Sequence, residues 1–248
     1  MSVAPAVTPE PVDLSYLPDP VAPAGRIGLI TLATDFNGED DLRRIIPHDV
    51  GLFTTRIENA NPITVDTLRS MADDLPRAAR TLLPGYGVDV AIFGCTSGTA
   101  VNGSDRIEAL INMGMPGTAV TNPLLAADVA LRTIGAQKIA VVAPYVLDVT
   151  RSVAEQLIVR GFDVTRLLGF GLENDIDMTA IPPDALLAAA LQANSPDADA
   201  VFISCTAIRS AEIAERAEKL LGKPVITSNQ AMIWHALHLM KYDKPVAG

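Results

Sequence analysis

The two cysteines of this chain lie in segments of nearly the same pattern. Cys95 is in VDVAIFGCT (88–96) and Cys205 is in ADAVFISCT (198–206). Each segment is an apolar run closed by a small residue, which is typical of a buried strand that runs into a tight strand-to-helix turn. Two such turns could direct two thiols into one pocket. That arrangement suits proton transfer on opposite faces of a substrate, or attack by one thiol and proton donation by the other.

Small and hydroxyl residues follow both thiols. In a strand-to-helix turn the backbone N–H groups are not yet committed to helical bonds, so we expect them to hold a substrate carboxylate at Thr96, Ser97, Thr206 and Ala207. The same N–H groups and the helix dipole would lower the pKa of each thiol. The alternative is that cysteine only packs there as a small hydrophobe. The duplication favours a functional role.

Other polar residues are candidates for substrate contacts. Asn122 and the segment 228–230 each form a polar turn between a strand and a helix, where they could bind substrate oxygens or cap the helix. Tyr145 ends a predicted strand, where its hydroxyl could bind an anionic ligand or its ring could pack in a loop. His235 and His238 have no third metal ligand near them in the sequence, so we predict no metal site.

The elements that position these residues repeat along the chain. Residues 1–25 form a proline-rich arm, after which strands and helices alternate and the pattern restarts at residue 138. The two cysteines are 110 residues apart, and Asn122 and Asn229 are 107 apart. We therefore predict an α/β fold of two duplicated, doubly wound parallel-sheet lobes, 26–136 and 137–240, related by pseudo-two-fold symmetry. The C-terminal helix would complete part of the first lobe.

Because ligands bind at the carboxyl ends of parallel strands, the active site is expected in the cleft between the lobes, with one thiol on each wall. Strands are predicted at 26–32, 52–56, 89–94, 117–121, 138–143, 163–168, 200–204 and 224–228. Helices are predicted at 64–83, 104–112, 124–134, 151–160, 183–192, 211–221 and 231–240. The acidic runs 39–41 and 73–74 are predicted to lie on solvated faces.

Composition narrows the function classes. A hydrophobic content of 49% predicts a well-filled core, and a net charge of −10 argues against nucleic acid or an anionic membrane as partner. The sequence has neither a membrane-spanning apolar stretch nor a signal-peptide start, so we expect a cytoplasmic protein with free thiols. It also has no phosphate-binding glycine loop, serine nucleophile elbow or pyridoxal-phosphate lysine motif, which favours chemistry with no cofactor.

A G/S-C-T sequence at the end of a central strand in each lobe resembles the aspartate/glutamate racemase superfamily, over about residues 26–239. The segments 143–145 and 174–182 resemble the maleate isomerase and arylmalonate decarboxylase branch. The sequences FGLEND (170–175), SCTAIR (204–209) and TSNQA (227–231) are similar to the ectoine-utilisation proteins. The resemblance implies a cofactor-independent enzyme for a small carboxylate, and we expect a homo-oligomer, either a dimer or a tetramer, in which the arm could cross a subunit interface.

The resemblance implies a role for each thiol. Cys95 matches the cysteine that adds to the double bond in maleate isomerases, and Cys205 matches the one that transfers a proton on the other side. Arylmalonate decarboxylases keep only the second cysteine. Having both thiols therefore favours isomerisation or racemisation over decarboxylation, and both schemes need the same pair.

The resemblance also assigns substrate contacts. Tyr145 matches a substrate-contacting tyrosine and Asn174 a carboxylate-contacting asparagine. An early substrate-binding asparagine of maleate isomerases falls near Asp35, with Asn37 two residues on. Because an aspartate would repel a second carboxylate unless it is protonated or offset by a cation, this departure favours a substrate with an amine or another donor at that end. The alternatives are a catalytically silent small-ligand-binding protein on the same scaffold and a structural disulfide between the two cysteines.

Overall fold

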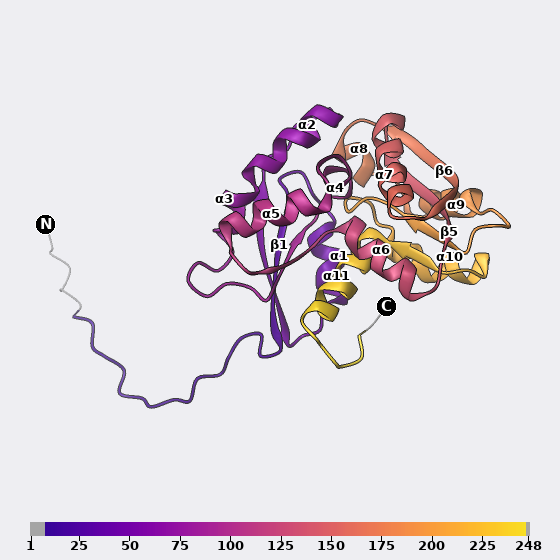
Figure 1. Cartoon of the computed structure of the whole chain (residues 1–248). Coiled ribbons are helices and arrows are strands. Elements are labelled where there is room, and N and C mark those ends of the chain that lie inside the picture. The colour runs from indigo at the N-terminus through magenta and orange to yellow at the C-terminus, as the bar shows by residue number, and fades with distance from the viewer. Residues whose placement is uncertain (1–7, 247–248) are drawn as a thin grey trace, which may run out of the picture.

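The computed structural model describes residues 8–246, which form two α/β lobes (Figure 1). Each lobe contains one four-stranded parallel sheet. The first sheet has the order β2-β1-β3-β4, from β1 (Gly25–Leu32), β2 (Val50–Ile57), β3 (Val90–Phe93) and β4 (Ala119–Thr121). The second has the order β6-β5-β7-β8, from β5 (Lys138–Tyr145), β6 (Asp163–Leu172), β7 (Ala200–Ile203) and β8 (Val225–Thr227). The strand order is the same in both, as the sequence repeat predicts.

Helices cover both faces of each sheet, so the central strands are buried on both sides and read as continuous apolar runs. The first lobe contains α1 (Gly38–Ile45), α2 (Val65–Ser70), the 3-10 helix η1 (Met71–Asp74), α3 (Leu75–Ala79), α4 (Thr96–Asn102), α5 (Ser104–Gly114) and α6 (Pro123–Thr133). The second contains α7 (Leu147–Val159), α8 (Asp175–Thr179), α9 (Pro183–Ala193), the 3-10 helix η2 (Ala211–Ile213), α10 (Ala214–Leu221) and α11 (Ser228–Leu239).

The helix boundaries differ from the sequence prediction in the first lobe. The single helix predicted over 64–83 is divided into α2, η1 and α3, and Pro76 lies in the first turn of α3, where its missing N–H costs least. Helix α1 was not predicted because its sequence is mostly charged. Its acidic residues lie in the first turn and its basic residues in the last, which complements the helix dipole.

One hydrophobic core joins the two lobes. It contains Ile30 and Phe93 of the first sheet together with Val141 and Phe202 of the second. A second cluster packs α11 against the first sheet, where this helix contacts β3 and β4, and Met232 belongs to the cluster together with Ile27 and Leu29 of β1. The last helix of the chain therefore covers a face of the first lobe. Residues from both lobes are found in each of the two hydrophobic clusters.

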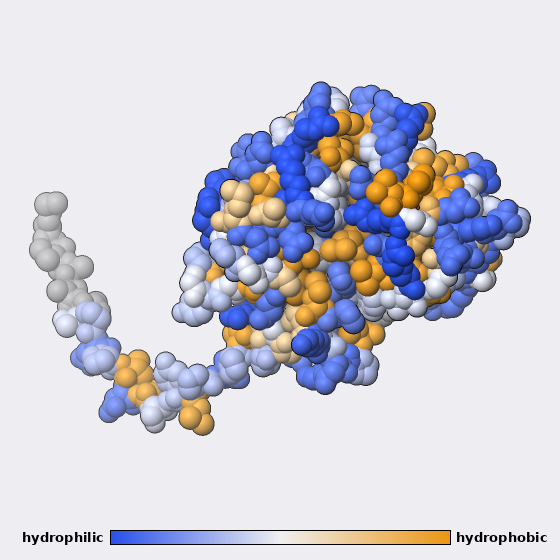
Figure 2. Space-filling model, in the orientation of Figure 1, coloured by the Kyte–Doolittle hydropathy of each residue, from blue (hydrophilic) through white to orange (hydrophobic). Residues whose placement is uncertain are grey.

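The described part of the arm, residues 8–24, extends away from the body (Figure 1). Figure 2 shows hydrophobic side chains along it in open solvent, and their exposed fractions are high at Val12 (77%), Tyr16 (84%), Leu17 (92%) and Val21 (87%). Among the described residues, no helix has both the length and the apolar character needed to cross a membrane.

Candidate active site

Each thiol follows a central strand after one small residue: Gly94 separates Cys95 from β3, and Ser204 separates Cys205 from β7. They line one pocket, whose other walls are formed by Leu32, Asp35, Thr96, Ser97, Tyr145, Asp175, Thr206 and Ala207. The structure thus brings together most of the residues that the sequence singled out. The cavity has a volume of about 10 Å³, room for about one water molecule, so a substrate must displace wall atoms to enter.

Cys95 is the N-cap residue of α4 and is buried. Its Sγ accepts the backbone N–H of Gly98 at 3.3 Å and lies 3.6 Å from the Ser97 hydroxyl. A Cβ atom at position 98 would lie 3.0 Å from that sulfur and 2.2 Å from the terminal methyl group of Met71, so a larger residue would crowd the thiol and displace Met71. The helix predicted at 104–112 is present as α5 (Ser104–Gly114), and a further short helix, α4, begins at Thr96 immediately after the thiol.

Cys205 has a different environment. Its φ of 114° is a conformation that costs a non-glycine residue free energy, and such strain is concentrated at functional sites. Its N–H donates to the Ser228 hydroxyl at 3.1 Å, and its Sγ accepts the N–H of Ala207 at 3.3 Å. No helix begins here, because residues 206–210 form a loop that leads to η2. The prediction of a strand-to-helix turn is right for Cys95 and wrong for Cys205.

Burial decides the protonation of both thiols. It raises the pKa of Cys95 and of Cys205 to about 12, and this rise is only partly opposed by the Ser97 hydroxyl and Gly98 N–H beside Cys95 and by the Tyr145 hydroxyl and Ala207 N–H beside Cys205. The charge of Asp175 also raises both pKa values. The expectation of lowered thiol pKa values is therefore wrong, because loss of solvent outweighs the N–H groups. The ligand-free protein holds two neutral, unlinked thiols, so the structure contains no disulfide between them.

The pocket walls are joined across the lobes by hydroxyl contacts. The Thr96 hydroxyl lies 2.9 Å from that of Ser228, which also accepts the N–H of Cys205. The Thr206 hydroxyl donates to the carbonyl oxygen of Gly94 at 3.0 Å. Each thiol-bearing segment is thus tied to the opposite lobe, which fixes the two thiols relative to each other.

A buried carboxylate stands behind this junction. Asp41 in α1 is only 1% exposed, and its Oδ2 accepts amide hydrogens from Asn37 at 2.9 Å and Asn229 at 2.7 Å. The prediction that 39–41 is a solvated face is therefore wrong at Asp41, because α1 packs this side against α11. Burial raises the pKa of Asp41. The Asn37 amide points into this network, donating also to the Ile208 carbonyl, and it does not line the pocket.

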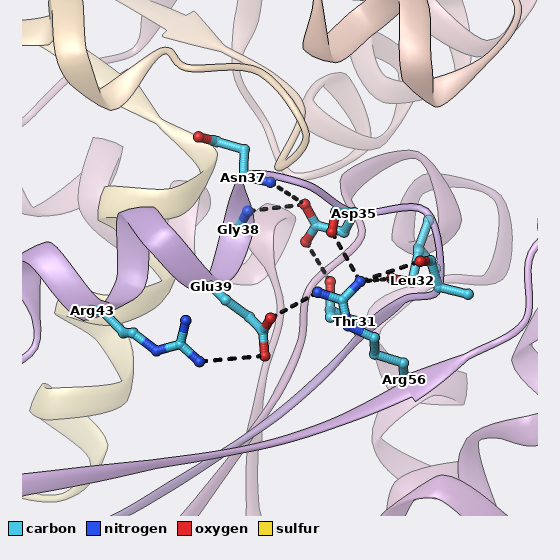
Figure 3. A network of polar contacts seen from close by, with 9 residues as sticks. Thr31, Leu32, Asp35, Asn37, Gly38, Glu39, Arg43 and Arg56 are labelled. Atoms are coloured by element: carbon cyan, nitrogen blue, oxygen red, sulfur yellow. Dashed lines mark hydrogen bonds and ion pairs between the residues drawn. The ribbon is translucent and has the colours of Figure 1, made fainter.

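Asp35 lines the pocket and is held by its own loop (Figure 3). Its Oδ1 accepts the N–H groups of Asn37 and Gly38 at 2.9 Å each, and its Oδ2 accepts the Thr31 hydroxyl at 2.5 Å. A Cβ atom at position 38 would lie 2.4 Å from Asp35 Oδ2, which explains the glycine there. These three donors stabilise the carboxylate without any basic side chain.

Arg56 supports the same loop from outside. Its guanidinium donates to the carbonyl oxygens of Leu32, Ala33 and Asp35 at 2.9 to 3.2 Å, and it pairs with Glu39 at 2.7 Å (Figure 3). Glu39 is also paired with Arg43. The Arg56 guanidinium therefore binds backbone carbonyl oxygens and the Glu39 carboxylate, and it does not line the pocket.

Two predicted substrate contacts lie elsewhere. Asn174 caps α8, where its side chain binds the N–H and carboxylate of Asp177 at 3.1 and 2.6 Å. Asn122 caps α6 and accepts the N–H of Leu125 at 2.9 Å. Neither lines the pocket, because each amide is engaged at the helix end that it caps. A substrate role for either stays a prediction.

Asp175 is the polar pocket residue that the sequence did not predict. It is 4% exposed, and its Oδ2 accepts hydrogen bonds from the Thr34 hydroxyl and, at 2.8 Å, from the Asn59 amide, both in the first lobe. Burial raises its pKa, and the nearby charge of Asp35 adds to this effect. The signal lay in the FGLEND segment, one residue beyond the asparagine that was chosen.

The two histidines of α11, His235 and His238, do not line the pocket. His235 is buried, its Nδ1 lies 2.7 Å from the Thr121 hydroxyl, and burial lowers its pKa. The Trp234 ring stacks on both His235 and His238. Within residues 8–246, no group of three or more His, Cys, Asp or Glu side chains is arranged to hold a metal ion.

Comparison with known proteins gives one family. A sequence model of arylmalonate decarboxylase matches residues 59–248. A maleate isomerase of Geobacillus stearothermophilus is 24% identical over 226 residues, which covers 86% of this chain and 90% of that protein. The structure of a Nocardia farcinica maleate cis-trans isomerase mutant with a covalently bound succinylcysteine intermediate superposes with a TM-score of 0.80 at 21% identity, over 87% of this chain and 92% of that chain. A liganded mutant of arylmalonate decarboxylase gives 0.80 at 23% identity, over 90% and 95%.

Proposed function

The chain belongs to the arylmalonate decarboxylase family, and from that premise we propose that it is a cofactor-independent isomerase or racemase that acts on a small carboxylate through Cys95 and Cys205. One observation carries the proposal: two thiols from different lobes line the same pocket. A decarboxylase needs one proton donor on one face, whereas exchange between two faces needs a donor and an acceptor on opposite sides.

In a racemisation, the thiolate of one cysteine removes the proton from the carbon next to the substrate carboxylate, and the negative charge is delocalised into that carboxylate. The opposite thiol then donates its proton to the other face. The two sulfurs end with their protonation states exchanged, so the reverse reaction uses the same pair. The N–H groups of Thr96 and Ser97, at the start of α4, are the proposed donors to the carboxylate.

Maleate cis-trans isomerisation is the second candidate, and the maleate isomerases among the relatives favour it. In that scheme the Cys95 thiolate adds to one alkene carbon, the electron pair moves to the neighbouring carbon, and Cys205 protonates it. Rotation about the new single bond and reversal of these steps give the trans product. Decarboxylation of a malonate and ligand binding without turnover are the remaining alternatives.

The finer assignment that we propose is an amino-acid-type intermediate of ectoine breakdown. It rests on the similarity of 170–175, 204–209 and 227–231 to the ectoine-utilisation protein EutA. This assignment is compatible with the acidic character of the pocket, which contains two aspartates and no basic side chain among its described lining residues.

The test is solvent exchange in deuterated water, read by NMR, with a panel of dicarboxylates and N-acetylated diamino acids. We expect deuterium uptake at the carbon next to the carboxylate of one compound. Cys95→Ser and Cys205→Ser should each lower the exchange rate at least about a hundredfold while circular dichroism stays unchanged. Full activity in either variant would contradict the two-thiol mechanism.

The same panel separates the candidates. Conversion of maleate to fumarate would make the second candidate the function, and release of carbon dioxide from a substituted malonate would make the protein a decarboxylase. Binding that protects both thiols from alkylation, with no exchange on any compound, would indicate a binding protein.

A further inference from the structure

Two carboxylates, one from each lobe, share the pocket with the thiols. Asp35 comes from the loop after β1 and Asp175 from the start of α8, and they are 7% and 4% exposed. None of the described lining residues is a lysine, arginine or histidine. A second negative charge brought here by a ligand would meet two acids in a buried site that has room for about one water molecule, where little solvent can screen the repulsion.

The two carboxylates differ in the hydrogen bonds that their oxygens accept. Asp35 accepts three hydrogen bonds from its own loop, shared between both of its oxygens. Both hydrogen bonds of the Asp175 carboxylate end on Oδ2, from Thr34 and Asn59. Its Oδ1 accepts none from the described residues. A carboxylate oxygen prefers to accept hydrogen bonds, so Asp175 presents an open acceptor at the pocket wall.

A hydroxyl without a well-formed hydrogen bond lies in the same pocket. Tyr145 is 2% exposed, and its hydroxyl lies near the Cys205 thiol but makes no hydrogen bond of good geometry with any described residue. Leaving a buried hydroxyl unpaired costs free energy, which a bound polar group would recover. A ligand with an acceptor for Tyr145 and a donor for Asp175 would satisfy both groups.

We infer that the substrate carries a cationic group, a primary ammonium in the simplest case, which donates to Asp175 Oδ1 while its carboxylate lies toward Tyr145 and the N–H groups at the start of α4. Asp35 supplies the second negative charge on that side. The inference rests on the proposed function and adds the substrate class: a small ammonium carboxylate, not a dicarboxylate. Asp175 is the residue that determines this specificity.

The cation would also favour the chemistry. Burial is the main reason that the thiol pKa values are high, and the charge of Asp175 raises both further. An ammonium group bound to Asp175 offsets that charge, so a thiolate forms more readily when the substrate is present than when the pocket is empty. The free protein would then keep its thiols unreactive until substrate binds.

Two sets of matched probes test the inference by calorimetry. Within each set only the end group changes: β-alanine, butanoate and succinate form the shorter set, and 4-aminobutanoate, pentanoate and glutarate the longer. We expect the ammonium compound of at least one set to bind about tenfold tighter, or more, than its methyl and carboxylate counterparts. Equal or tighter binding of the counterparts in both sets, or no binding of either ammonium compound, would overturn the inference.

Variants assign the preference to its residue. Asp175→Asn should lower the preference for the ammonium end at least about tenfold, whereas Asp177→Asn, which removes an exposed carboxylate from the same helix, should leave it unchanged. Thermal unfolding checks that each variant is folded. If Asp175→Asn does not fold, Asp175→Glu should retain the ammonium preference. Retention of the full preference in a folded Asp175→Asn protein would overturn the inference.

These measurements are independent of turnover. The binding preference should persist in Cys95→Ser, which is expected to be inactive. Loss of preference with deuterium exchange intact would overturn the substrate class and leave the two-thiol mechanism standing. A preference for the ammonium compound with no deuterium exchange on any compound would overturn the two-thiol mechanism and leave the substrate class standing.

Discussion

At the scale of single residues, burial governs the two cysteines. They lie at strand ends with N–H donors, as a reactive thiol would, yet both are 3 to 4% exposed and their pKa values are raised to about 12. In the ligand-free pocket both thiols are therefore protonated at neutral pH. Generation of a thiolate must be coupled to substrate binding, and this coupling predicts low reactivity in the free protein.

We expect both thiols to react slowly with iodoacetamide. At pH 8 a thiol with a pKa near 12 is almost wholly protonated, so alkylation in the folded protein should be at least about a hundredfold slower than in the urea-unfolded chain. Mass spectrometry of tryptic peptides separates the two sites. Equal rates in the folded and unfolded chains would contradict the raised pKa values.

The same pKa values predict an alkaline stability loss. Because the folded-state pKa of each thiol lies above its unfolded value of 9.0, the resulting stabilisation is complete below pH 9 and is lost as pH rises toward about 12. The slope is at most about 1.4 kcal/mol per pH unit for each thiol. Urea unfolding between pH 8.5 and 10.5 should show a steeper decline in the wild type than in the Cys95→Ser/Cys205→Ser variant. Parallel declines would exclude this contribution.

At the scale of elements, the two thiol segments are duplicated in sequence but not in conformation. Cys95 is followed by α4, whereas Cys205 has a positive φ and is followed by a loop. Ser228 holds this loop at the N–H of Cys205, and the side-chain amides of Asn229 and Asn37 bind its carbonyl oxygens. The loop places Thr206 against the first lobe. The element that fixes this arrangement is the junction of α1 with α11, where Asp41 is buried.

We expect Asp41→Ala to destabilise the fold by about 2 to 3 kcal/mol, because it leaves the buried amides of Asn37 and Asn229 without the oxygen that accepts their hydrogen bonds. Asp40→Ala is the matched control. It removes the neighbouring carboxylate, which is 58% exposed and paired with Arg44, and should cost less than about 1 kcal/mol. Urea unfolding measures both changes. A cost at Asp41 no larger than that at Asp40 would show that the buried network contributes little.

At the scale of the whole molecule, the described part of the arm, residues 8–24, extends away from the two lobes. Its apolar side chains are 75 to 92% exposed between Val12 and Val21, while the lobes behind it share a common core. Apolar side chains along an extended segment gain free energy by packing against another surface. This supports the prediction of a dimer or tetramer in which the arm crosses a subunit interface.

Removal of residues 1–20 should therefore lower the oligomeric mass. Size-exclusion chromatography with light scattering compares the full chain with the truncated one at several concentrations. We expect the full chain to be a dimer or tetramer, and the truncated chain to dissociate at higher protein concentration. An unchanged dissociation profile would remove the arm from the interface.

The sequence by itself determined the fold class, the duplicated strand order and the convergence of Cys95 and Cys205, because buried parallel strands leave continuous apolar runs and their carboxyl ends meet at one edge. It also marked the tyrosine and the first aspartate of the pocket. These features depend on local pattern and on the repeat.

Only the tertiary structure decided the rest. Asp175 enters the pocket while its neighbour Asn174 caps a helix, Asp41 is buried although its neighbour Asp40 is exposed, and burial reverses the expected thiol pKa shift. The physical reason is common to all three. Desolvation and hydrogen-bond partners come from elements distant in the sequence, so the state of a polar group is set by packing that its own segment does not encode.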